Sequence, residues 1–362
     1  MSLSNATPFA AEFFRQFNMV GALNGVVAVR GTFDIVPDGT ISVSSVQVPF
    51  QWSDEYEGEP QDSHLVTPAD FVPYKPGTDV TVLGVTYAPG GEAATDWVCG
   101  IRVGTRLEKL VRVHGTRYWE PKVKPPRPSL IGREAEAQFE GWAMTRAEPA
   151  TVVPLSWRLA FGGARPLRPG EAPPAEKHPD NGLGPGLLDL HHSPHDARLP
   201  APRIEEVDDP VVDWRQDHVP QGFAPVPPWW LCRRKHAGTI DDRWIKERHP
   251  ILPEDFDFRF WQVAPPGLVA EPWLGGDEVL QFAYMHPEIE LLQTRLPGLS
   301  LSARVQHPGH AAQDHPLVLD GVHVDFRRGA DRVTLTWRTA FACESDDARI
   351  VLTLAGGERS PA

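Results

Sequence analysis

The chain has 362 residues, of which 41% are hydrophobic and 23% are charged. This length accommodates two or more domains with sizeable cores, and the composition is that of a globular protein. The formal net charge is −13 at pH 7. Binding to nucleic acid or to an anionic membrane surface requires an excess of Lys and Arg, so the charge argues against both. A partner attracted by charge should be basic.

Proline and tryptophan are the unusual components, with 38 and 12 residues. Proline breaks helices and cannot donate to a sheet ladder, whereas buried tryptophans order a chain by packing. The sequence therefore predicts long ordered loops over β-sheets, with few helices.

The cysteines and the hydrophobic pattern bear on the compartment. Cys99, Cys232 and Cys343 lie far apart, and a sparse, odd set of this kind suits a reducing cytosol. The first residues lack the basic start and long apolar core of a signal peptide. No stretch approaches the ~18 apolar residues of a membrane span. We expect a cytoplasmic protein.

Strand signals dominate residues 1–150. Apolar residues alternate through 26–36 and 41–50, on either side of an Asp-Gly turn. Further alternating runs occupy 78–89, 96–119 and 136–144. Strands spaced by about ten residues, with glycine turns between them, indicate an antiparallel sandwich or barrel. We assign residues 1–150 to an N-terminal β lobe.

The pattern changes in the middle of the chain. Residues 151–275 hold many of the prolines and few periodic runs, and we interpret them as an ordered Pro/Trp-rich belt. Strand signals return in 276–362, which we assign to a C-terminal β lobe. The predicted fold is mainly β, with two antiparallel strand-rich lobes joined by the belt and few short helices.

One short pattern occurs twice. "LSWRLAF" at 155–161 is similar to "LTWRTAF" at 335–341, including the rare Trp-Arg pair. Two interpretations remain open. The first is duplication of a β unit, and the second is chance similarity between two amphipathic strands.

A metal-dependent enzyme is one possible interpretation of two acidic and histidine-rich motifs. His191, His192 and His195 offer imidazoles that suit Zn²⁺, although Pro194 places them in a surface turn and no HExxH motif occurs. In "DFD", Asp255 and Asp257 would face one side of a strand and could share a cation or an acid–base step. No phosphate-binding loop accompanies them.

Nine short motifs follow one another from residue 154 onward. They are "PLSWRLAFGG" at 154–163, "HPDNGLG" at 178–184, "LPAPRIE" at 199–205, "PQGFAPVPPWW" at 220–230, "GTIDDRW" at 238–244, "LPEDFDFRF" at 252–260, "VAPP" at 263–266, "LGGDE" at 274–278 and "LP" at 296–297. Their order and spacing resemble an accessory family encoded in bacterial type VI secretion loci, and the similarity extends over about residues 18–350. Genes for that family, formerly a domain of unknown function, lie beside those for the VgrG spike, PAAR tips and toxic effectors.

The resemblance implies an adaptor or chaperone without enzymatic activity or cofactor. Such a protein binds a toxin effector in the cytoplasm and helps load it onto the VgrG or PAAR spike. This sequence has His178 where the family motif usually starts with Asn, and "HHSPH" is particular to it, which leaves the cargo open. The alternatives are the metal-dependent hydrolase or transferase and a purely structural subunit of the secretion machine.

The motifs supply two sets of candidate residues. The predicted partner-binding residues are Trp157, Trp229, Trp230, Arg233, Asp241, Trp244, Asp255, Asp257 and Trp261. The residues predicted to hold the fold are Phe161, Gly162, Gly163, Gly184, Pro200, Gly222, Phe223, Gly238, Pro253, Phe256, Pro265, Pro266, Gly276, Asp277 and Glu278.

The stretch at 252–261 carries a structural prediction of its own. We interpret "LPEDFDFRFW" as an extended segment with Phe256, Phe258 and Phe260 facing the core. Its charged residues would then face outward.

Overall fold

The protein is described here from a computed structural model that gives the structure of residues 2–36, 39–124, 138–165, 175–188, 198–327, 331–343 and 347–355. In these residues the chain is mainly β, and its α-helices are short: α1 (Leu231–Arg234) and α2 (Asp242–Glu247). The predicted mainly β class with few short helices is confirmed. No helix in the described ranges has the length and apolarity needed to cross a membrane.

The chain divides into two compact units. Unit 1 contains Met1–Gly84, Ile101–Lys109 and Phe223–Ala362, and unit 2 contains Val85–Gly100 and Leu110–Gly222. This grouping differs from the three consecutive segments drawn from the sequence, because strands from the two ends of the chain pair directly.

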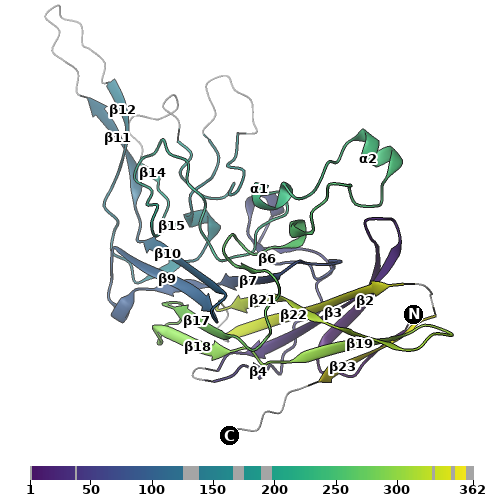
Figure 1. The fold of residues 1–362 in the computed structure, drawn as a ribbon. Helices are drawn as coiled ribbons and strands as arrows, with labels where there is room; N and C mark the ends of the chain where they lie inside the picture. Colours follow the sequence, from purple (N-terminus) through teal and green to yellow (C-terminus); the bar gives the residue numbers. More distant parts are fainter. Residues whose placement is uncertain are drawn as a thin grey trace, which may run out of the picture. The chain divides into compact units, whose positions relative to one another are not determined.

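A seven-stranded sheet forms the main sheet of unit 1. Its order is β16-β7-β21-β22-β3-β2, with β4 added beside β3, and β7 and β21 run parallel to each other. β3 from the N-terminal segment pairs antiparallel with β22 from the C-terminal segment (Figure 1). The strands are β2 (Ala10–Phe17), β3 (Leu23–Asp34), β4 (Ser42–Val43), β7 (Thr78–Leu83), β16 (Val269–Ala270), β21 (Val318–Asp325) and β22 (Arg332–Ala342).

Smaller sheets complete unit 1. A four-stranded sheet has the order β1-β23-β19-β20, β17 and β18 form a hairpin, and β5 pairs with β6. Their bounds are β1 (Ser2–Asn5), β5 (Glu55–Tyr56), η1 (Pro60–Asp62), β6 (Leu65–Thr67), β17 (Val279–Ala283), β18 (Leu291–Arg295), β19 (Ser300–Gln306), β20 (Gln313–Pro316) and β23 (Arg349–Ala355).

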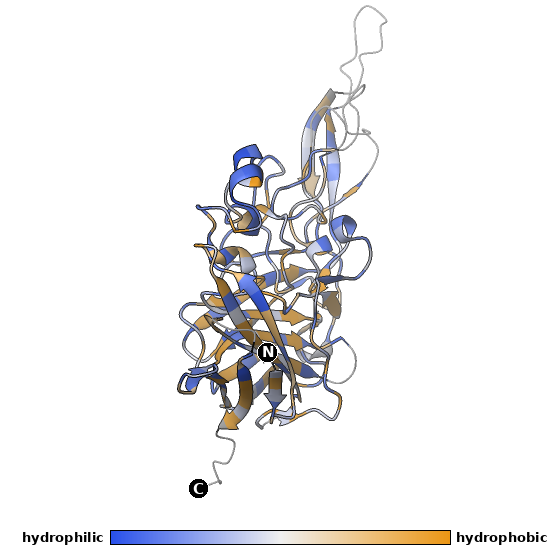
Figure 2. Cartoon of the chain, turned by 90° about the vertical axis from the view of Figure 1, so that its right-hand side faces the viewer, coloured by the Kyte–Doolittle hydropathy of each residue, from blue (hydrophilic) through white to orange (hydrophobic). Residues whose placement is uncertain are grey.

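Apolar residues on the strands of the main sheet form the core of unit 1. The ring of Phe9 stacks on Trp337 at a centroid distance of 5.9 Å and lies 5.4 Å from Phe33. Figure 2 shows orange, hydrophobic residues running along the strands and blue, hydrophilic residues in α2 and many loops. β3 and β7 are buried on both faces, whereas buried and partly exposed residues alternate along β17 and β19.

The main sheet also buries ion pairs. Arg30 binds Asp70 at 2.8 Å, and Arg338 binds Asp320 at 2.6 Å. Arg338 also donates to the backbone oxygens of Asp70 and Val72, at 2.7 Å each. A buried charge is tolerated only when it is paired and hydrogen-bonded, so these side chains fix the chain segment 70–72 on the sheet.

Unit 2 is built from short strands and turns. β8 pairs with β13, β11 pairs with β12 and β14, and β10 pairs with β15. Their bounds are β8 (Val85–Tyr87), η2 (Pro89–Gly91), β9 (Asp96–Val103), β10 (Leu107–His114), β11 (Tyr118–Lys124), β12 (Gln138–Met144), β13 (Val152–Pro154), η3 (Trp157–Leu159), β14 (Leu199–Pro200) and β15 (Ile204–Glu206). The tip of hairpin β9–β10 belongs to unit 1.

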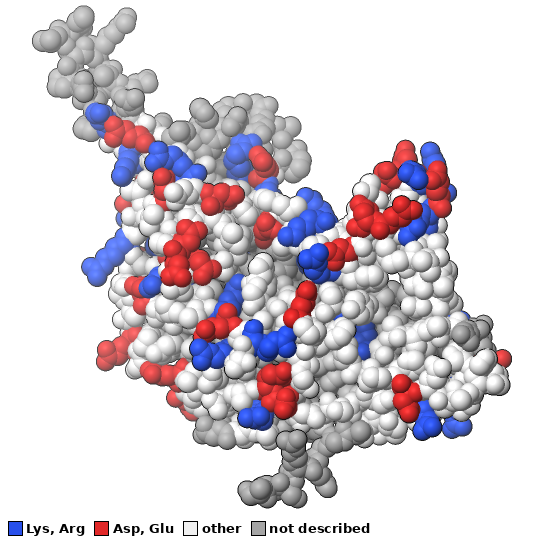
Figure 3. All heavy atoms as spheres, in the orientation of Figure 1, with Lys and Arg blue, Asp and Glu red and all other residues white. Residues whose placement is uncertain are grey.

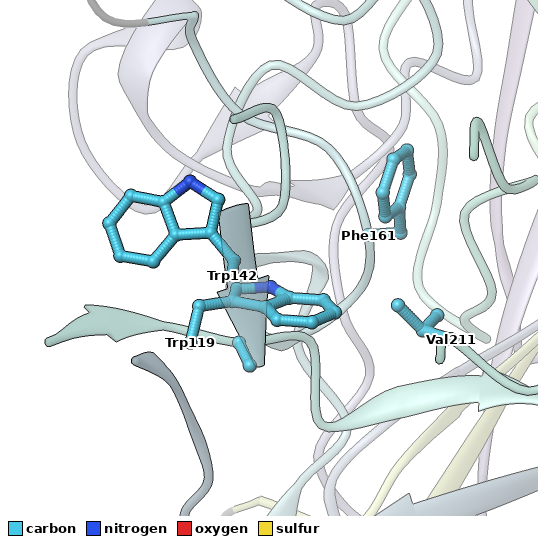
Figure 4. Packing of buried hydrophobic residues seen from close by; sticks show 5 residues of the cluster. Trp119, Trp142, Phe161 and Val211 are labelled. Atoms are coloured by element: carbon cyan, nitrogen blue, oxygen red, sulfur yellow. The ribbon is translucent and has the colours of Figure 1, made fainter. Parts of the chain in front are cut away.

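A tryptophan cluster forms a core of unit 2. Trp119 and Trp142, on paired strands, pack with Phe161 and Val211 (Figure 4). Trp119 is 1% exposed and Trp142 is 4% exposed. Both tryptophans come from the predicted N-terminal lobe, and Phe161, Ala201 and Val211 of the predicted belt pack against them.

Glu205 on β15 is the main buried charge of unit 2. Its carboxylate accepts the N–H of Val211 at 3.0 Å and contacts Arg117 Nη2 at 2.6 Å and His114 Nε2 at 2.7 Å. Burial raises the pKa of Glu205, but these hydrogen bonds and the Arg117 charge outweigh it and lower the pKa to about 2.

Unit 2 should therefore lose stability in acid through Glu205. A folded-state pKa of about 2 lies below the ordinary 4.5, so the carboxylate stabilises the fold above pH 4.5 and stops doing so as the pH falls toward 2. At neutral pH this contribution is on the order of 3 kcal/mol. Urea unfolding followed by tryptophan fluorescence should show this loss in the wild type and a much flatter pH profile in Glu205→Gln.

Glu206→Gln on the same strand is the matched control and should keep the wild-type profile. An unchanged acid profile in Glu205→Gln would assign the acid sensitivity to other carboxylates.

Candidate functional site

Residues 226–263 leave the main sheet of unit 1 and return to it as one excursion, which we call the arm (Figure 1). The Val226 N–H donates to Val263 O at 2.8 Å and closes its base. α2 lies at the end of the arm farthest from β7. Eight of the predicted partner-binding residues belong to the arm: Trp229, Trp230, Arg233, Asp241, Trp244, Asp255, Asp257 and Trp261.

Arg233 on α1 fastens the base of the arm from inside. Its Nη1 donates to Val226 O at 2.6 Å and its Nε donates to Phe260 O at 3.0 Å. The guanidinium lies 5.5 Å from the centroid of the Phe260 ring. Burial lowers the pKa of Arg233, and the negative charges of Asp54 and Asp79 act against this effect. One buried side chain thus joins the outgoing and returning halves of the arm.

Asp79 on β7 attaches the returning half to the sheet. Its carboxylate accepts the backbone N–H groups of Val263 and Ala264, both at 3.0 Å. Lys75 Nζ lies 2.8 Å from the same carboxylate. The "VAPP" motif is therefore held by a charged side chain that precedes it by 184 residues.

The stretch 252–261 is not the extended segment predicted from its alternation. Phe258–Trp261 form a 3₁₀ helix, η4, and Asp257 caps it by accepting the Arg259 N–H at 2.9 Å. Phe256 contacts the rings of Phe258, Phe260 and Trp261 at centroid distances of 5.6, 5.7 and 6.0 Å. A local side-chain cap and aromatic packing thus override the period-two pattern.

Asp255 and Asp257 serve different contacts instead of sharing one site. Asp257 pairs with Arg259 and lies 3.2 Å from His236 Nδ1, and the Arg259 hydrogen bond is the main reason why its pKa falls to about 2. Asp255 accepts Thr239 N–H and Thr239 Oγ1–H, both at 2.8 Å. These bonds lower the pKa of Asp255.

The hydrogen bonds between Asp255 and Thr239 join the two ends of the outer half of the arm, residues 239–255, into a closed loop. Gly238, which precedes it, has φ +73°, and a Cβ there would lie 2.8 Å from both Asp255 Oδ1 and Pro253 Cβ. The "GTIDDRW" and "LPEDFDFRF" motifs therefore meet at this closure, where only glycine fits.

Helix α2 is capped and fixed to the returning chain. Asp241 Oδ1 accepts the Trp244 N–H at 2.8 Å, and the Trp244 indole N–H donates to Ile251 O at 2.8 Å. Arg248 donates to Leu252 O and to Met19 O. A helix this short is not stable alone, so these side chains account for its order.

A groove of about 420 Å³ lies between α2 and the returning segment 251–255. Acidic and basic side chains gather over this end of the arm (Figure 3). The groove is lined by Thr239, Asp241, Arg243, Trp244, Glu247, Arg248, Ile251, Pro253, Glu254 and Asp255.

The structure separates the predicted binding residues by burial. Trp157, Trp230 and Arg233 are 3%, 4% and 6% exposed, so their side chains lie in the interior and offer a partner little surface. Trp229 stacks on Tyr56 at 5.4 Å, and Trp261 is half-buried in the aromatic cluster of the arm. Among the candidates only Asp241 and Asp255, both at the α2 end, are exposed, and Trp229, Trp244, Asp257 and Trp261 are half-buried.

Several residues predicted to hold the fold form a backbone junction in unit 2. Gly162 and Gly163 have φ +144° and +97°, and the space beside them is filled by Asn181 and Gly184. Asn181 is fully buried, and its side-chain amide donates to Trp157 O and Phe161 O, both at 2.9 Å. Asn181 was not among the predicted residues, although it belongs to the "HPDNGLG" motif.

The other residues of that set also occupy turns and close contacts. The Glu278 carboxylate accepts the Gly275 and Gly276 N–H groups at 2.7 and 2.9 Å. Pro200 lies in β14 opposite Tyr118, and Phe223 O accepts the Val82 N–H at 2.9 Å. Gly222 packs on the Trp157 ring. Pro265 O accepts a hydrogen bond from the Leu268 N–H, and Pro266 O accepts one from Lys109 Nζ. Asp277 O accepts one from Arg295.

The candidate metal ligands gain no support from geometry. His191, His192 and His195 lie outside the described residues. Within the described ranges, no three His, Cys, Asp or Glu side chains are grouped as a metal site requires.

The comparisons with known proteins identify the family. A bacterial family described as "Uncharacterized protein conserved in bacteria (DUF2169)" matches residues 21–338. The chain belongs to the DUF2169 family. No curated protein and no solved structure matches the chain. The arm, the tryptophan cluster and the glycine junction all lie within the matched residues.

Replacement of Arg233 should destabilise the arm of this DUF2169 protein. Arg233→Lys keeps the charge but removes the planar fork that reaches two carbonyl groups. We expect it to lower the free energy of unfolding by ~2 kcal/mol, the range for hydrogen bonds to a buried charge. Faster amide hydrogen exchange should appear in residues 226–263.

The control for this prediction is Arg234→Lys on the same helix. Arg234 is exposed, so its replacement should change stability by less than ~0.5 kcal/mol. Equal effects of the two substitutions would show that Arg233 does not fasten the arm.

Proposed function

We propose that this DUF2169 protein is a non-enzymatic adaptor that binds a type VI secretion effector and helps load it onto the VgrG or PAAR spike. The observation that carries the proposal is the arm. It is an ordered excursion from a β scaffold, with motif residues that close it and with accessible apolar and charged side chains at its α2 end.

Two isoleucines at the α2 end support docking of a protein. Ile240 is 63% exposed and Ile245 is 56% exposed. When a partner covers large apolar side chains that were exposed to water, the free energy of the complex falls. Both sit on a segment held at Asp241 and Asp255, so binding costs little ordering of the chain.

The partner classes follow from charge and from the family resemblance. A net charge of −13 favours a basic protein partner over nucleic acid or an anionic membrane. The resemblance of the ordered motifs to the type VI accessory family suggests a toxin effector, VgrG and PAAR as the partners. The proposal places the protein in the cytoplasm and requires neither a cofactor nor a catalytic group.

The experiment is recovery of the partner and its reconstitution. The tagged protein is isolated from its bacterium under secretion-active conditions, and each co-purifying protein is then produced separately and titrated against it. We expect a toxin to form a stoichiometric complex. The double variant Ile240→Ser/Ile245→Ser should weaken that complex by about 30-fold, since covering each partly exposed isoleucine contributes ~1 kcal/mol and ~2 kcal/mol in total corresponds to that factor.

The matched control replaces two exposed valines of unit 2, Val212→Ser/Val219→Ser, which are 69% and 65% exposed in the wild type. This variant should bind the toxin normally. Binding to the spike without any effector would support a purely structural subunit instead. Stoichiometric bound metal with no protein partner would support the metal-dependent hydrolase or transferase.

A further inference from the structure

We infer that the groove beside α2 is a docking site for a partner segment in which Arg or Lys side chains stand next to apolar ones. This inference rests on the proposed adaptor function and names the chemistry of the segment that the arm recognises. The groove measures about 420 Å³, enough for one or two long side chains.

The charged lining of the groove is mainly acidic. Its carboxylates are those of Asp241, Glu247, Glu254 and Asp255, and its cations are those of Arg243 and Arg248. Arg248 is half-buried and directs its guanidinium at the backbone oxygens of Met19 and Leu252. The acidic groups consequently exceed the cations on the accessible part of the lining.

The pKa of Arg243 is raised by the negative charges around the groove. Its hydrogen bond to Glu247 raises its pKa most, and the charges of Glu247, Glu254 and Asp241 raise it further. Carboxylates from both walls therefore act on one cation. A second cation brought by a partner would meet the same attraction.

The pair that now occupies the groove is easily replaced. Arg243 Nε lies 3.1 Å from Glu247 Oε2, and the two side chains are 78% and 66% exposed. Exposed pairs of this kind contribute little to stability, so a partner's Arg or Lys can take the place of Arg243 at low cost. Glu254, which is 81% exposed and 3.7 Å from Arg248, is a second accessible acceptor.

Apolar surface next to these charges selects for a mixed segment. Trp244, Ile251 and Pro253 line the groove, and the exposed Ile240 and Ile245 stand beside it in the chain. An indole face also attracts cations. Acidic groups would repel an anionic ligand, and a purely charged peptide would leave the apolar surface uncovered.

Neutralisation of the two accessible acids tests the inference. The probe is a short fluorescein-labelled peptide of alternating Arg and Leu, and its affinity is measured by fluorescence anisotropy. Glu247→Gln/Glu254→Gln should bind it about tenfold more weakly than the wild type at ~0.05 M salt, and this difference should shrink at ~0.5 M salt. The same peptide with Glu in place of Arg should not bind.

Glu92→Gln/Glu288→Gln is the matched control, since it changes the net charge equally at exposed positions outside the groove. It should bind as the wild type does. Equal affinity of the groove variant and this control, or no binding to any of the proteins, would overturn the inference.

The adaptor proposal is judged separately through the toxin. The Ile240→Ser/Ile245→Ser variant could lose the toxin complex while the peptide binds equally well to the groove variant and to its control. That result would support the adaptor proposal and contradict only the inferred basic segment. A toxin complex unaffected by either pair of changes would remove the arm from both proposals.

Discussion

The carboxylate of Asp79 fixes where the arm returns to the sheet. It is 2% exposed, pairs with Lys75, and accepts two consecutive backbone N–H groups, those of Val263 and Ala264. Without it, two buried donors and a buried ammonium group would lose their acceptor, each at a cost of ~1–3 kcal/mol. Arg233, the aromatic residues 256–261 and α2 all belong to the arm, whose returning end this contact fixes.

Buried charge performs the same task elsewhere in unit 1. Arg338 reaches Asp320 with one nitrogen and two backbone oxygens with another, and Arg30 reaches Asp70. Loop segments that cross a sheet leave carbonyl groups in need of donors, and a guanidinium supplies several at fixed angles. Apolar packing would bury as much surface but would not specify which loop residue lies where.

Sequence patterns predicted the strands well where alternation was local. Residues 26–34 of the run at 26–36 belong to β3, and the strand signals of 276–362 include β21 and β22. Buried and partly exposed residues alternate through most of β21, whereas β3 and most of β22 are buried on both faces. The pairing of β3 with β22 was not predicted, since alternation carries no information about the partner strand. The same holds for Asp79, whose role depends on residues 184 positions away.

The two similar heptapeptides show why a local pattern is insufficient. Residues 335–341 lie in β22, whereas 155–161 contain the 3₁₀ helix Trp157–Leu159, so the two segments do not form the same β unit. Ser156 accepts the Arg158 N–H at 3.2 Å and starts that helix. In the C-terminal copy, Thr336 lies opposite Arg30 in the ladder, and β3 and β21 hold the strand on both sides. Neighbours in space decide between two structures for one pattern.

In the proposed adaptor, an arm ordered by its own hydrogen bonds and a weakly paired groove would allow a cargo to be held and then released. Caps at Asp241 and Asp255 order the α2 end before any partner arrives, so contact energy is not spent on folding the loop. The exposed surface itself is modest: two isoleucines, one half-buried tryptophan and a few carboxylates. In the proposed adaptor such a surface would raise the rate of association more than the affinity, because exposed charges contribute to the rate of encounter more than to affinity. Stronger anchoring would need the tryptophans that this fold keeps in its interior.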